Sequence, residues 1–538
     1  MISSCFKPSI YQQGIIEWVN NKDEKHGICN AVAGSGKSTT LLLVAQSLEK
    51  NGFSPNDIKI IVFGKLNSVD LVNKFGQKWK HSISTLHSIG FKLTRKIIDI
   101  KPKVDKFKYH TISKELGYFS TSERWGKLLA KEYISSESQF IGLFNLCRLN
   151  LLETTSQNLR QLARYHGLDE IYDYKQCAIA MYDLHELGLA ITEQNGTIDY
   201  TDMVYYPVDR QFWICPWFVP SLFVLVDECQ DLNPLQKIFS MGLVGHSNDP
   251  NSSESTKGRL LYVGDPHQAI FGFAGASCNS YYEIKEATNA LELPLSLCYR
   301  CPKSHIRLVN QIFPEIPIKA TDKAIEGVLT YSDKDKLQHR ENDLILCRSS
   351  APLIAYCFEL ISQGFLARIK GRDIGKSLLK ELDRVCRYNK QLEGKKTDSS
   401  STDISNFLNW LESYQIISYA RLISQENSEV AIESLGDRLN CLKEVFMTLG
   451  RDSSRVHLER RIAGIFTDSN SAILLSTIHR AKGLEQNRVF VLEYDLLPLT
   501  WSKQKDWEFQ QECNLLYVAL TRSKNELTLV VSNDKNKE

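Results

Sequence analysis

The sequence lacks an excess of either charge sign, because 65 Lys and Arg residues face 63 Asp and Glu residues, for a net charge of +2. A chain with this balance must hold any anionic partner through a local patch. No apolar run approaches the ~18 residues that a membrane span needs, and the N-terminus has no apolar signal-peptide core. We therefore predict a cytoplasmic protein with no membrane partner.

Cysteine is sparse, with 14 residues scattered through 538 positions. Only Cys298 and Cys301 have CxxC spacing, and no second pair follows to complete a zinc site, so we interpret the cysteines as reduced thiols. Hydrophobic residues make up 43% of the chain, which excludes a disordered or fibrous protein. The length predicts about three or four domains.

Short apolar or β-branched runs recur along the chain, and each is followed by turn residues and a helical pattern. This alternation predicts βαβ units and parallel sheets. The runs fall into two groups, which indicates two sheets: 58–63, 223–226 and 260–263 in the first, then 344–347, 472–476, 489–492 and 527–531. The segments 101–195 and 376–465 have little strand pattern and are predicted to be helical insertions.

The strongest motif is ICNAVAGSGKSTTLLLVA at 28–45, which has the strand end, Gly-rich turn and helical run of a P-loop. Gly34 and Gly36 let backbone N–H groups face phosphates without an obstructing Cβ. Lys37 is predicted to reach the β and γ phosphates, and the Ser38 hydroxyl is predicted to bind Mg²⁺. The first consensus glycine of the motif is Ala31 here, so the pattern is imperfect.

A second motif, FVLVDECQDLNPLQ at 223–236, is an apolar strand that ends in two carboxylates. Beside a P-loop, such a strand end serves ATP hydrolysis. Asp227 is predicted to hold the Mg²⁺ ion, and Glu228 is predicted to polarise the attacking water.

Residues 227–231, DECQD, form a DExQD box, and with it the sequence resembles superfamily 1 helicases of the UvrD/Rep type. Further motifs of that family follow in family order from residue 12 to residue 524. They are PSIYQQGII, IVFGKLN, STLHS, IDYTDMV, VGDPHQAIFGFAGA, LCYRCP, DLILCRS, STIHRAKGLE and QECNLLYVALTRSK. The FxGA and YRCP spellings are nearer to the F-box DNA helicase branch, although no region the size of an F-box precedes residue 12.

The resemblance implies ATP and Mg²⁺ as cofactors. It assigns adenine recognition to Gln12, adenine stacking to Tyr299 and a ribose contact to Glu485. Gln268 would couple the phosphates to the nucleic-acid strand, and Arg300 and Arg522 would be arginine fingers that stabilise the transition state. The predicted nucleotide-binding loop contains Ala33, Gly34, Ser35, Gly36, Lys37, Ser38 and Thr39.

The resemblance also implies a single-strand binding site. Phe63, Phe271 and Phe273 stand at positions where aromatic faces stack on successive bases, at ~1–3 kcal/mol each. The positions of Thr85, His87 and His479 match other strand contacts. Stacking does not read base sequence, so it suits a motor that steps along any strand.

The predicted fold class is α/β, with two RecA-like motor domains that have parallel sheets and each carry a mainly helical insertion. The first motor domain is assigned to 1–100 and 196–290, and its insertion to 101–195. The second motor domain is assigned to 291–375 and 466–538, and its short insertion to 376–465.

The predicted function is an ATP-dependent 3′→5′ DNA helicase or single-strand translocase that acts on single-stranded and tailed duplex DNA. A second hypothesis is a DNA-stimulated ATPase subunit of a larger complex in phage defence or repair. It is favoured by the short second insertion and by the end of the sequence 16 residues after Arg522, where relatives have a strand-separating hairpin. Thr39 and Ala274 are further departures, because relatives often have arginine there; without them, Tyr299 is the expected adenine-stacking face and one polar link is missing. A P-loop ATPase that binds no nucleic acid is disfavoured by the strand motifs.

Overall fold

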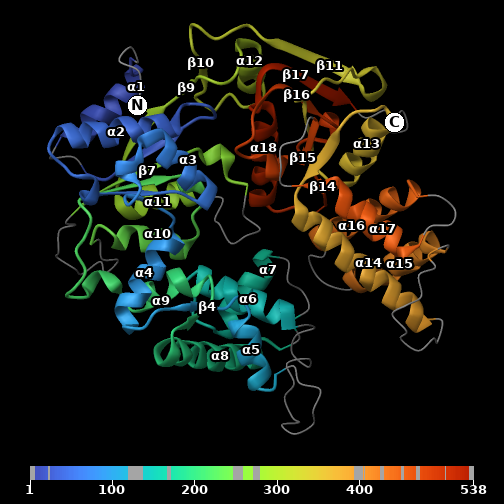
Figure 1. Ribbon diagram of the computed structural model, residues 1–538, viewed down its shortest axis with the longest axis horizontal. Helices are drawn as coiled ribbons and strands as arrows, with labels where there is room; N and C mark the ends of the chain where they lie inside the picture. Colours follow the sequence, from blue (N-terminus) through green and yellow to red (C-terminus); the bar gives the residue numbers. More distant parts are fainter. Residues whose placement is uncertain are drawn as a thin grey trace. The chain divides into compact units, whose positions relative to one another are not determined.

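The computed structural model describes residues 7–21, 25–118, 137–166, 171, 173–245, 258–270, 279–392, 404, 406–423, 429–449, 454–467, 473–502 and 504–531. The chain forms two compact units, Met1–Cys298 and Tyr299–Glu538. Each unit is an α/β domain with a parallel sheet (Figure 1). The predicted fold class, with two RecA-like domains, is therefore confirmed.

The sheet of the first unit has six strands in the order β3-β2-β6-β7-β1-β8, and all its paired strands are parallel. The strands are β1 (Gly27–Ala31), β2 (Ile58–Ile61), β3 (Ile83–Ser84), β6 (Phe223–Asp227), β7 (Arg259–Gly264) and β8 (Leu291–Leu295). The sequence prediction placed residues from 291 onward in the second motor domain, whereas β8 pairs with β1. β8 is an edge strand, where Pro294 is tolerated, and this proline weakens the strand pattern in the sequence.

Alternating side chains of this sheet enter two separate hydrophobic clusters, as expected when helices cover both faces. Ile60 and Leu225 join one cluster, with residues of α1 (Ile10–Asn20), α2 (Lys37–Lys50) and α3 (Lys65–Phe75). Ile61 and Val224 join the other cluster. Its helices are α4 (Leu86–Ile98), α9 (Asp202–Asp209), α10 (Pro234–Gly242) and α11 (Ser280–Thr288).

The described part of the first insertion contains four helices and a hydrophobic cluster of its own. The helices are α5 (Lys108–Glu115), α6 (Glu137–Leu149), α7 (Ser156–His166) and α8 (Tyr174–Asn195), and Figure 1 shows them gathered together. At the two ends of the insertion, β4 (Lys103–Val104) pairs in parallel with β5 (Thr197–Ile198). This pairing brings both connections of the insertion to one place.

A buried ionic cluster ties this insertion to the first motor domain. Asp202, at the start of α9, accepts hydrogen bonds from Lys108 Nζ at 2.7 Å, Arg148 Nη1 at 2.7 Å and Tyr109 OH at 2.9 Å. Arg148 also donates to Asp199 at 2.6 Å. Burial by itself would raise the pKa of Asp202, but Arg148 and Lys108 outweigh it and hold that pKa below its usual value.

We expect Asp202→Asn to lower the free energy of unfolding by about 3–5 kcal/mol, because it leaves two buried cations with one carboxylate fewer. Urea unfolding measures the change. Asp183→Asn is the control, since Asp183 accepts a hydrogen bond from Tyr118 at the exposed surface, and its unfolding curve should match that of the wild type. Equal stability of the two variants would mean that the cluster does not hold the insertion in place.

The sheet of the second unit has seven strands in the order β11-β17-β16-β12-β15-β13-β14, again all parallel. The strands are β11 (Val328–Asp333), β12 (Leu344–Cys347), β13 (Ala367–Lys370), β14 (Phe466–Thr467), β15 (Ile473–Thr477), β16 (Gln486–Val491) and β17 (Ser523–Val531). The accompanying helices include α12 (Lys303–Ile312), α13 (Ala351–Ser362) and α18 (Asp506–Leu520).

The second insertion differs from the first because it shares one hydrophobic cluster with its sheet. Its helices are α14 (Arg372–Leu392), α15 (Phe407–Ile423), α16 (Glu429–Met447) and α17 (Arg455–Ile465). Ile345 of β12 and Leu475 of β15 belong to the same buried cluster as Leu378 of α14 and Leu442 of α16. The insertion is therefore a continuation of the second motor core.

A polar contact reinforces this junction. Asp437 of α16 accepts hydrogen bonds from the backbone N–H groups of Ser350 and Ala351, both at 3.0 Å, where α13 begins. A carboxylate at a helix N-terminus stabilises the helix through its dipole and its unpaired N–H groups.

Among the described residues, no helix is both long and apolar enough to cross a lipid bilayer.

Candidate nucleotide and strand sites

The loop between β1 and α2 has the geometry that phosphate binding requires. Gly34 and Gly36 adopt positive φ angles of 66° and 80°, which a residue with a Cβ adopts only with strain. Gly36 is the N-cap of α2 and makes no side-chain cap, so the helix N-terminus keeps N–H groups for an anion. The buried Ser35 Oγ has no hydrogen-bond partner in the described part of the chain. The loop fits a polyphosphate.

Lys37, the first residue of α2, lies against two carboxylates at the end of β6: Asp227 is the last residue of the strand and Glu228 follows it. Its Nζ atom is 2.7 Å from Glu228 Oε2. Glu228 has a left-handed backbone with φ 53° and ψ 45°, which is uncommon for a residue other than glycine and is often found at functional sites. The structure thus brings Lys37 to the adjacent Asp227 and Glu228, although Lys37 precedes Glu228 by 191 residues in the sequence.

Charge in this site is strongly coupled. Burial raises the pKa of Asp227 and the neighbouring Glu228 raises it further, to about 7, against the opposing effect of Lys37. Burial lowers the pKa of Lys37, but Glu228, Asp227 and Asp265 outweigh it and the pKa is raised. A divalent cation would favour the ionised form of Asp227, so the donor set fits a magnesium–nucleotide complex with Ser38 and Asp227 as the predicted metal ligands.

A chain of hydrogen bonds continues from Glu228 to Gln268. Gln230 Nε2 donates to Glu228 Oε2 at 2.6 Å, and Gln230 Oε1 accepts from the backbone N–H of Asp265 at 3.1 Å. Gln268 Nε2 then donates to Asp265 Oδ2 at 2.7 Å. A Cβ at Gly264 would lie 2.5 Å from Gln230 Oε1, so this glycine permits the close approach of the two loops.

Gln230 and Asp265 are site residues that the sequence reasoning did not single out. Both stand in the quoted motifs, directly after β6 and β7, and this position is the signal that could have found them. Parallel neighbouring strands end at the same edge of a sheet, so polar residues that follow them meet there.

Gln12 has protein partners for both ends of its side-chain amide. Its Oε1 atom accepts from the Ser9 backbone N–H at 3.0 Å, and its Nε2 atom donates to Thr40 Oγ1 at 3.2 Å. The side chain is buried and joins α1 to α2. Adenine recognition by Gln12 stays a prediction. In that role, Gln12 would donate the Nε2 hydrogen that does not bond to Thr40.

In the second unit, Arg300 and Arg522 lie in one cationic cluster. Glu485 accepts from Arg300 Nε at 2.5 Å and from Lys524 Nζ at 2.7 Å. Burial by itself would raise the pKa of Glu485, but these two cations lower it. One carboxylate thus stands among three cations, and the cluster carries positive charge for an anion.

Arg522 is fully buried, and its guanidinium bonds in the described structure are made to neutral oxygens. They go to the carbonyls of Val518 at 2.8 Å and Leu484 at 3.4 Å and to the Thr521 hydroxyl at 3.0 Å. Burial lowers the pKa of Arg522 to about 10, and the nearby Arg300 adds to the effect. Arg522 therefore stays charged at neutral pH and is rigidly held.

Another ion pair links two of the family motifs in the second unit. Arg348, after β12, makes a bidentate pair with the buried Glu512 of α18, with N–O distances of 2.7–2.9 Å. Burial lowers the pKa of His479 to about 3, with Arg348 and Arg480 adding to it. If His479 contacts the DNA strand, it therefore does so as a neutral imidazole.

Tyr299, which is predicted to stack on adenine, is 48% exposed.

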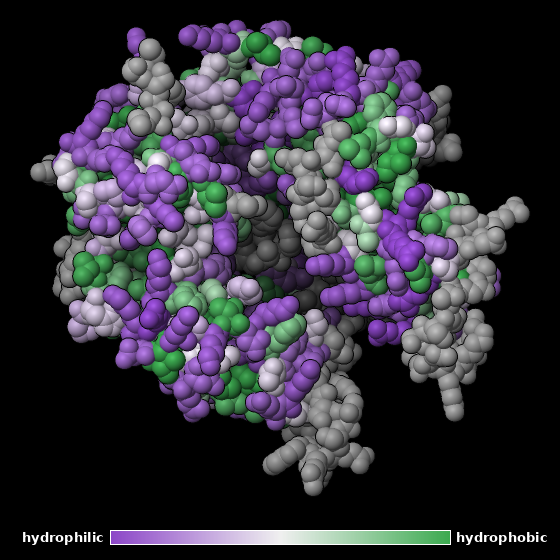
Figure 2. Space-filling view, in the orientation of Figure 1, coloured by the Kyte–Doolittle hydropathy of each residue, from purple (hydrophilic) through white to green (hydrophobic). Residues whose placement is uncertain are grey.

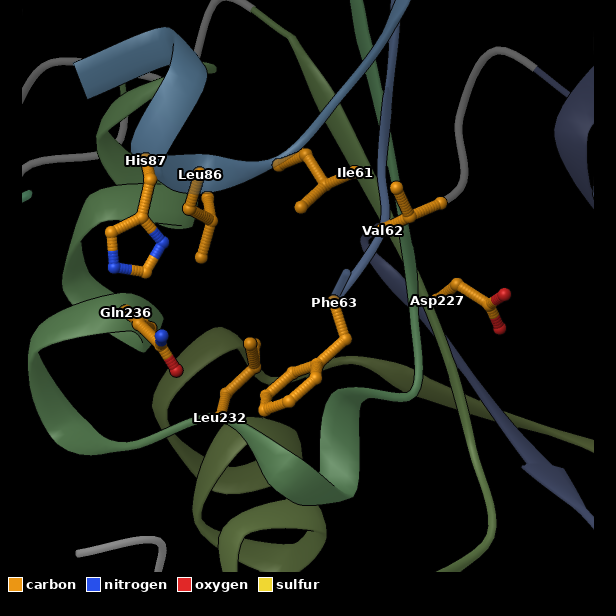
Figure 3. Close-up of a pocket in the computed structure, with 8 residues that line it drawn as sticks. All are labelled: Ile61, Val62, Phe63, Leu86, His87, Asp227, Leu232 and Gln236. Carbon is orange, nitrogen blue, oxygen red and sulfur yellow. The ribbon is translucent and has the colours of Figure 1, made fainter. Parts of the chain in front are cut away.

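The predicted strand residues of the first unit lie beside the magnesium-ligand candidate. Phe63, His87 and Asp227 line one cavity of about 10 Å³ (Figure 3). Phe63 is 49% exposed, and Thr85 caps α4 by accepting from Ser88 N–H at 3.2 Å. The cavity has room for about one water molecule, so a nucleobase cannot enter it and would have to stack on the exposed side of Phe63.

Figure 3 also shows a residue that was not singled out from the sequence. Gln236 of α10 lines the same cavity, and the Asp227 carboxylate is turned away from both Gln236 and His87. Asp227, the predicted magnesium ligand, therefore lines the same cavity as the predicted DNA contacts Phe63 and His87. The two other predicted stacking residues, Phe271 and Phe273, lie outside the described residues, as does Ala274.

Two family models together match most of the chain. Residues 17–289 match the model of the UvrD/REP helicase N-terminal domain, and residues 304–534 match that of the UvrD-like helicase C-terminal domain. The chain belongs to the UvrD/Rep helicase family. The hydrogen-bond chain of the first unit lies within the first match, and the cationic cluster around Arg522 has its members on both sides of residue 304.

Two curated relatives of this UvrD/Rep helicase have informative names. The F-box DNA helicase protein 1 of Schizosaccharomyces pombe is 25% identical over 324 residues, which is 57% of this chain and 33% of that protein. The Gabija protein GajB of Bacillus cereus is 24% identical over 359 residues, which is 61% of this chain and 66% of that protein. The alignments thus span a third and just under two thirds of the relatives' own lengths.

Proposed function

We propose that this UvrD/Rep-type chain is an ATP-driven DNA helicase that translocates along single-stranded DNA in the 3′→5′ direction. The observation that carries the proposal is the continuous chain of contacts from Lys37 through Glu228, Gln230 and Asp265 to Gln268. It connects the phosphate loop to Gln268, which precedes the predicted DNA contacts Phe271 and Phe273 in the sequence. DNA as the track, and the direction along it, are supported by the family resemblance.

The contacts suggest how ATP binding prepares hydrolysis. Lys37 Nζ lies 2.7 Å from Glu228 Oε2. Phosphate oxygens attract Lys37, and Glu228 is then free to orient the attacking water and accept its proton. Ser38 and Asp227 would hold a magnesium ion, which would neutralise charge on the phosphates. Arg300 and Arg522 supply further positive charge to the transition state.

The same contacts suggest how hydrolysis reaches the strand. Gln230 touches both Glu228 and the Asp265 backbone, so a change at Glu228 alters the loop that holds Gln268. Asp227 and the strand residues Phe63 and His87 share one small cavity, which gives a second route. We propose that these two connections couple ATP turnover to strand stepping.

The proposal is tested by ATPase activity with and without an oligo-dT strand, and by displacement of streptavidin from biotin-labelled strands. We expect strand-stimulated turnover and faster displacement from a 5′ end, which a 3′→5′ motor approaches. Faster displacement from a 3′ end would show that the motor moves 5′→3′ and would contradict the proposed direction. An ATPase that no strand stimulates would contradict the motor proposal itself.

A second candidate is a DNA-stimulated ATPase subunit of a larger complex, in defence or repair, with little unwinding of its own. The similarity to a Gabija protein and the fusion of the short second insertion with its motor core both favour it. Unwinding of a tailed duplex by the isolated chain separates the candidates. Long, processive unwinding without a partner would exclude the second.

We expect Phe63→Ala to weaken single-strand binding by ~5- to 150-fold, because one stacking contact contributes ~1–3 kcal/mol. Fluorescence anisotropy with labelled oligo-dT measures the affinity. Phe509→Ala, which removes another exposed aromatic ring, is the control. If both variants bind as the wild type does, Phe63 is not a base contact.

A further inference from the structure

Thr521, which directly follows α18, is fully buried and contacts both predicted arginine fingers of the second unit. Its hydroxyl oxygen accepts a hydrogen bond from Arg522 Nη2 at 3.0 Å. Its carbonyl oxygen accepts one from Arg300 Nη1 at 3.2 Å, although Arg300 precedes it by 221 residues in the chain. A single uncharged residue therefore holds a nitrogen of each cation.

The direction of the Thr521 hydroxyl is set by the end of α18. A hydroxyl has one hydrogen to donate, and Thr521 Oγ1 lies 2.9 Å from the carbonyl oxygen of Tyr517 and 3.1 Å from that of Val518. Both carbonyls belong to the last turn of the helix, where C=O groups lack the usual partner further along the helix. Because the hydrogen points to them, the lone pairs of the oxygen are left for Arg522 Nη2.

Arg522 keeps two N–H groups that make no hydrogen bond to any residue that the structure describes. Its guanidinium has five N–H groups. Three of them bond to the carbonyls of Val518 and Leu484 and to the Thr521 hydroxyl. The two that are left stand one on Nη1 and one on Nη2, and such a pair can bind two oxygens of a phosphate. The contact with Thr521 fixes Nη2 and so helps to set where this pair points.

The two arginines repel each other, so their placement needs a partner of this kind. Figure 2 shows hydrophilic residues spread widely over the visible surface, where charged side chains are normally found, whereas Arg522 is 1% exposed. Burial lowers the pKa of Arg522, and the nearby Arg300 lowers it further. A residue that accepts from both guanidinium groups offsets part of this cost and fixes them relative to each other.

We propose that Thr521 is a positioning residue that orients the arginine fingers, with its hydroxyl acting on Arg522 and its carbonyl on Arg300. The inference rests on the proposed function, which makes both arginines fingers for the transferred phosphate. Finger charge acts on the transition state more than on bound ATP. Loss of the hydroxyl should therefore lower kcat and leave KM for ATP nearly unchanged.

The test compares Thr521→Val, Thr521→Ser and Thr288→Val in the full chain by ATPase activity with oligo-dT. Valine keeps the shape of the side chain without the hydroxyl, whereas serine keeps the hydroxyl. Thr288 is the matched control, because it is buried at the end of α11 and donates to the carbonyl four residues earlier, that of Ile284, at 2.7 Å. Thr521 donates to Tyr517 in the same way, but no arginine donates to Thr288 in the described structure.

We expect Thr521→Val to lower kcat by about 10- to 150-fold, the factor that corresponds to one hydrogen bond to a charged group. Thr521→Ser and Thr288→Val should turn over ATP at close to the wild-type rate. Thermal melting reports the stability of each variant. If it shows that Thr521→Val is unfolded, Thr521→Ala, which also lacks the hydroxyl, takes its place. Wild-type turnover without the hydroxyl would overturn the proposal.

A double-mutant cycle with Arg522→Ala separates positioning from a purely structural role. Single-turnover hydrolysis measures the slow variants. If Thr521 acts through Arg522, adding Thr521→Val to Arg522→Ala lowers the rate no further. A second fall as large as the first would overturn the proposal, because Thr521 would then act independently of the finger. Failure of the proposed function looks different: the wild type would show no strand-stimulated ATPase, or Arg522→Ala would turn over at the wild-type rate.

Discussion

We expect ATP turnover to fall by about two to four orders of magnitude in Glu228→Gln, while ATP still binds. The glutamine keeps the size of the side chain and its contact with Gln230, but it cannot accept the proton of the attacking water. It also removes the charge that Lys37 pairs with at 2.7 Å, so Lys37 is released toward the phosphates. We therefore expect a variant that stalls with ATP bound.

Lys37→Ala should abolish turnover by a different route. It removes the cation predicted to face the phosphates and leaves the buried Asp227 and the partly buried Glu228 without the counter-charge of Lys37. ATP affinity should therefore fall, in contrast to Glu228→Gln. Calorimetric ATP binding beside steady-state turnover distinguishes the two variants, with Lys78→Ala, from an exposed pair with Glu49, as control. Turnover at the wild-type rate in Glu228→Gln would show that another group activates the water.

Arg522→Ala should reduce turnover by about three to five orders of magnitude, the range measured for arginine fingers. The guanidinium is fully buried, is held by three hydrogen bonds to neutral oxygens, and is charged at neutral pH. A cation fixed in this way needs no reorganisation when negative charge develops on a phosphate. Arg300→Ala should act in the same direction and also release Glu485 from its contact at 2.5 Å.

Single-strand binding without nucleotide should be unchanged in both finger variants, and oligo-dT anisotropy measures it. Arg307→Ala is the matched control, because Arg307 pairs with Glu326 at the exposed surface of the same unit. Thermal melting identifies any loss of fold, and Arg522→Lys restores a charge without the planar donor fork. A loss of strand affinity as large as the loss of turnover would assign these arginines to DNA binding.

Much of the nucleotide site could be predicted because its residues follow strands whose apolar pattern is plain. The run FVLV leads directly into Asp227, and the glycines around Ser35 admit few structures other than a phosphate loop. The strand runs beginning at 58, 223, 260, 344 and 489 all belong to strands of the structure. What could be predicted was the identity of the residues and the edge of the sheet at which they meet.

The connections between the residues could not be predicted in the same way. The contact from Gln230 to Asp265 depends on β6 and β7 being neighbours, and strand order is a property of the whole sheet. The left-handed backbone of Glu228 has no signal in the sequence, since glutamate rarely adopts it. Nor does an amphipathic helix show which core it joins, so the merging of Leu378 and Leu442 with the second sheet was not foreseen.

The contrast between the two insertions has a consequence for how this protein can change over evolution. The first insertion has a hydrophobic core separate from that of the motor domain. It can therefore be lengthened, shortened or replaced as a unit if the buried contacts of Asp202 are kept. The second insertion has no such freedom. Removing Leu378 or Ile462 with their helices would expose Ile345 and Leu475 of the sheet to water. New functions should therefore be gained in the second insertion by substitutions on its surface.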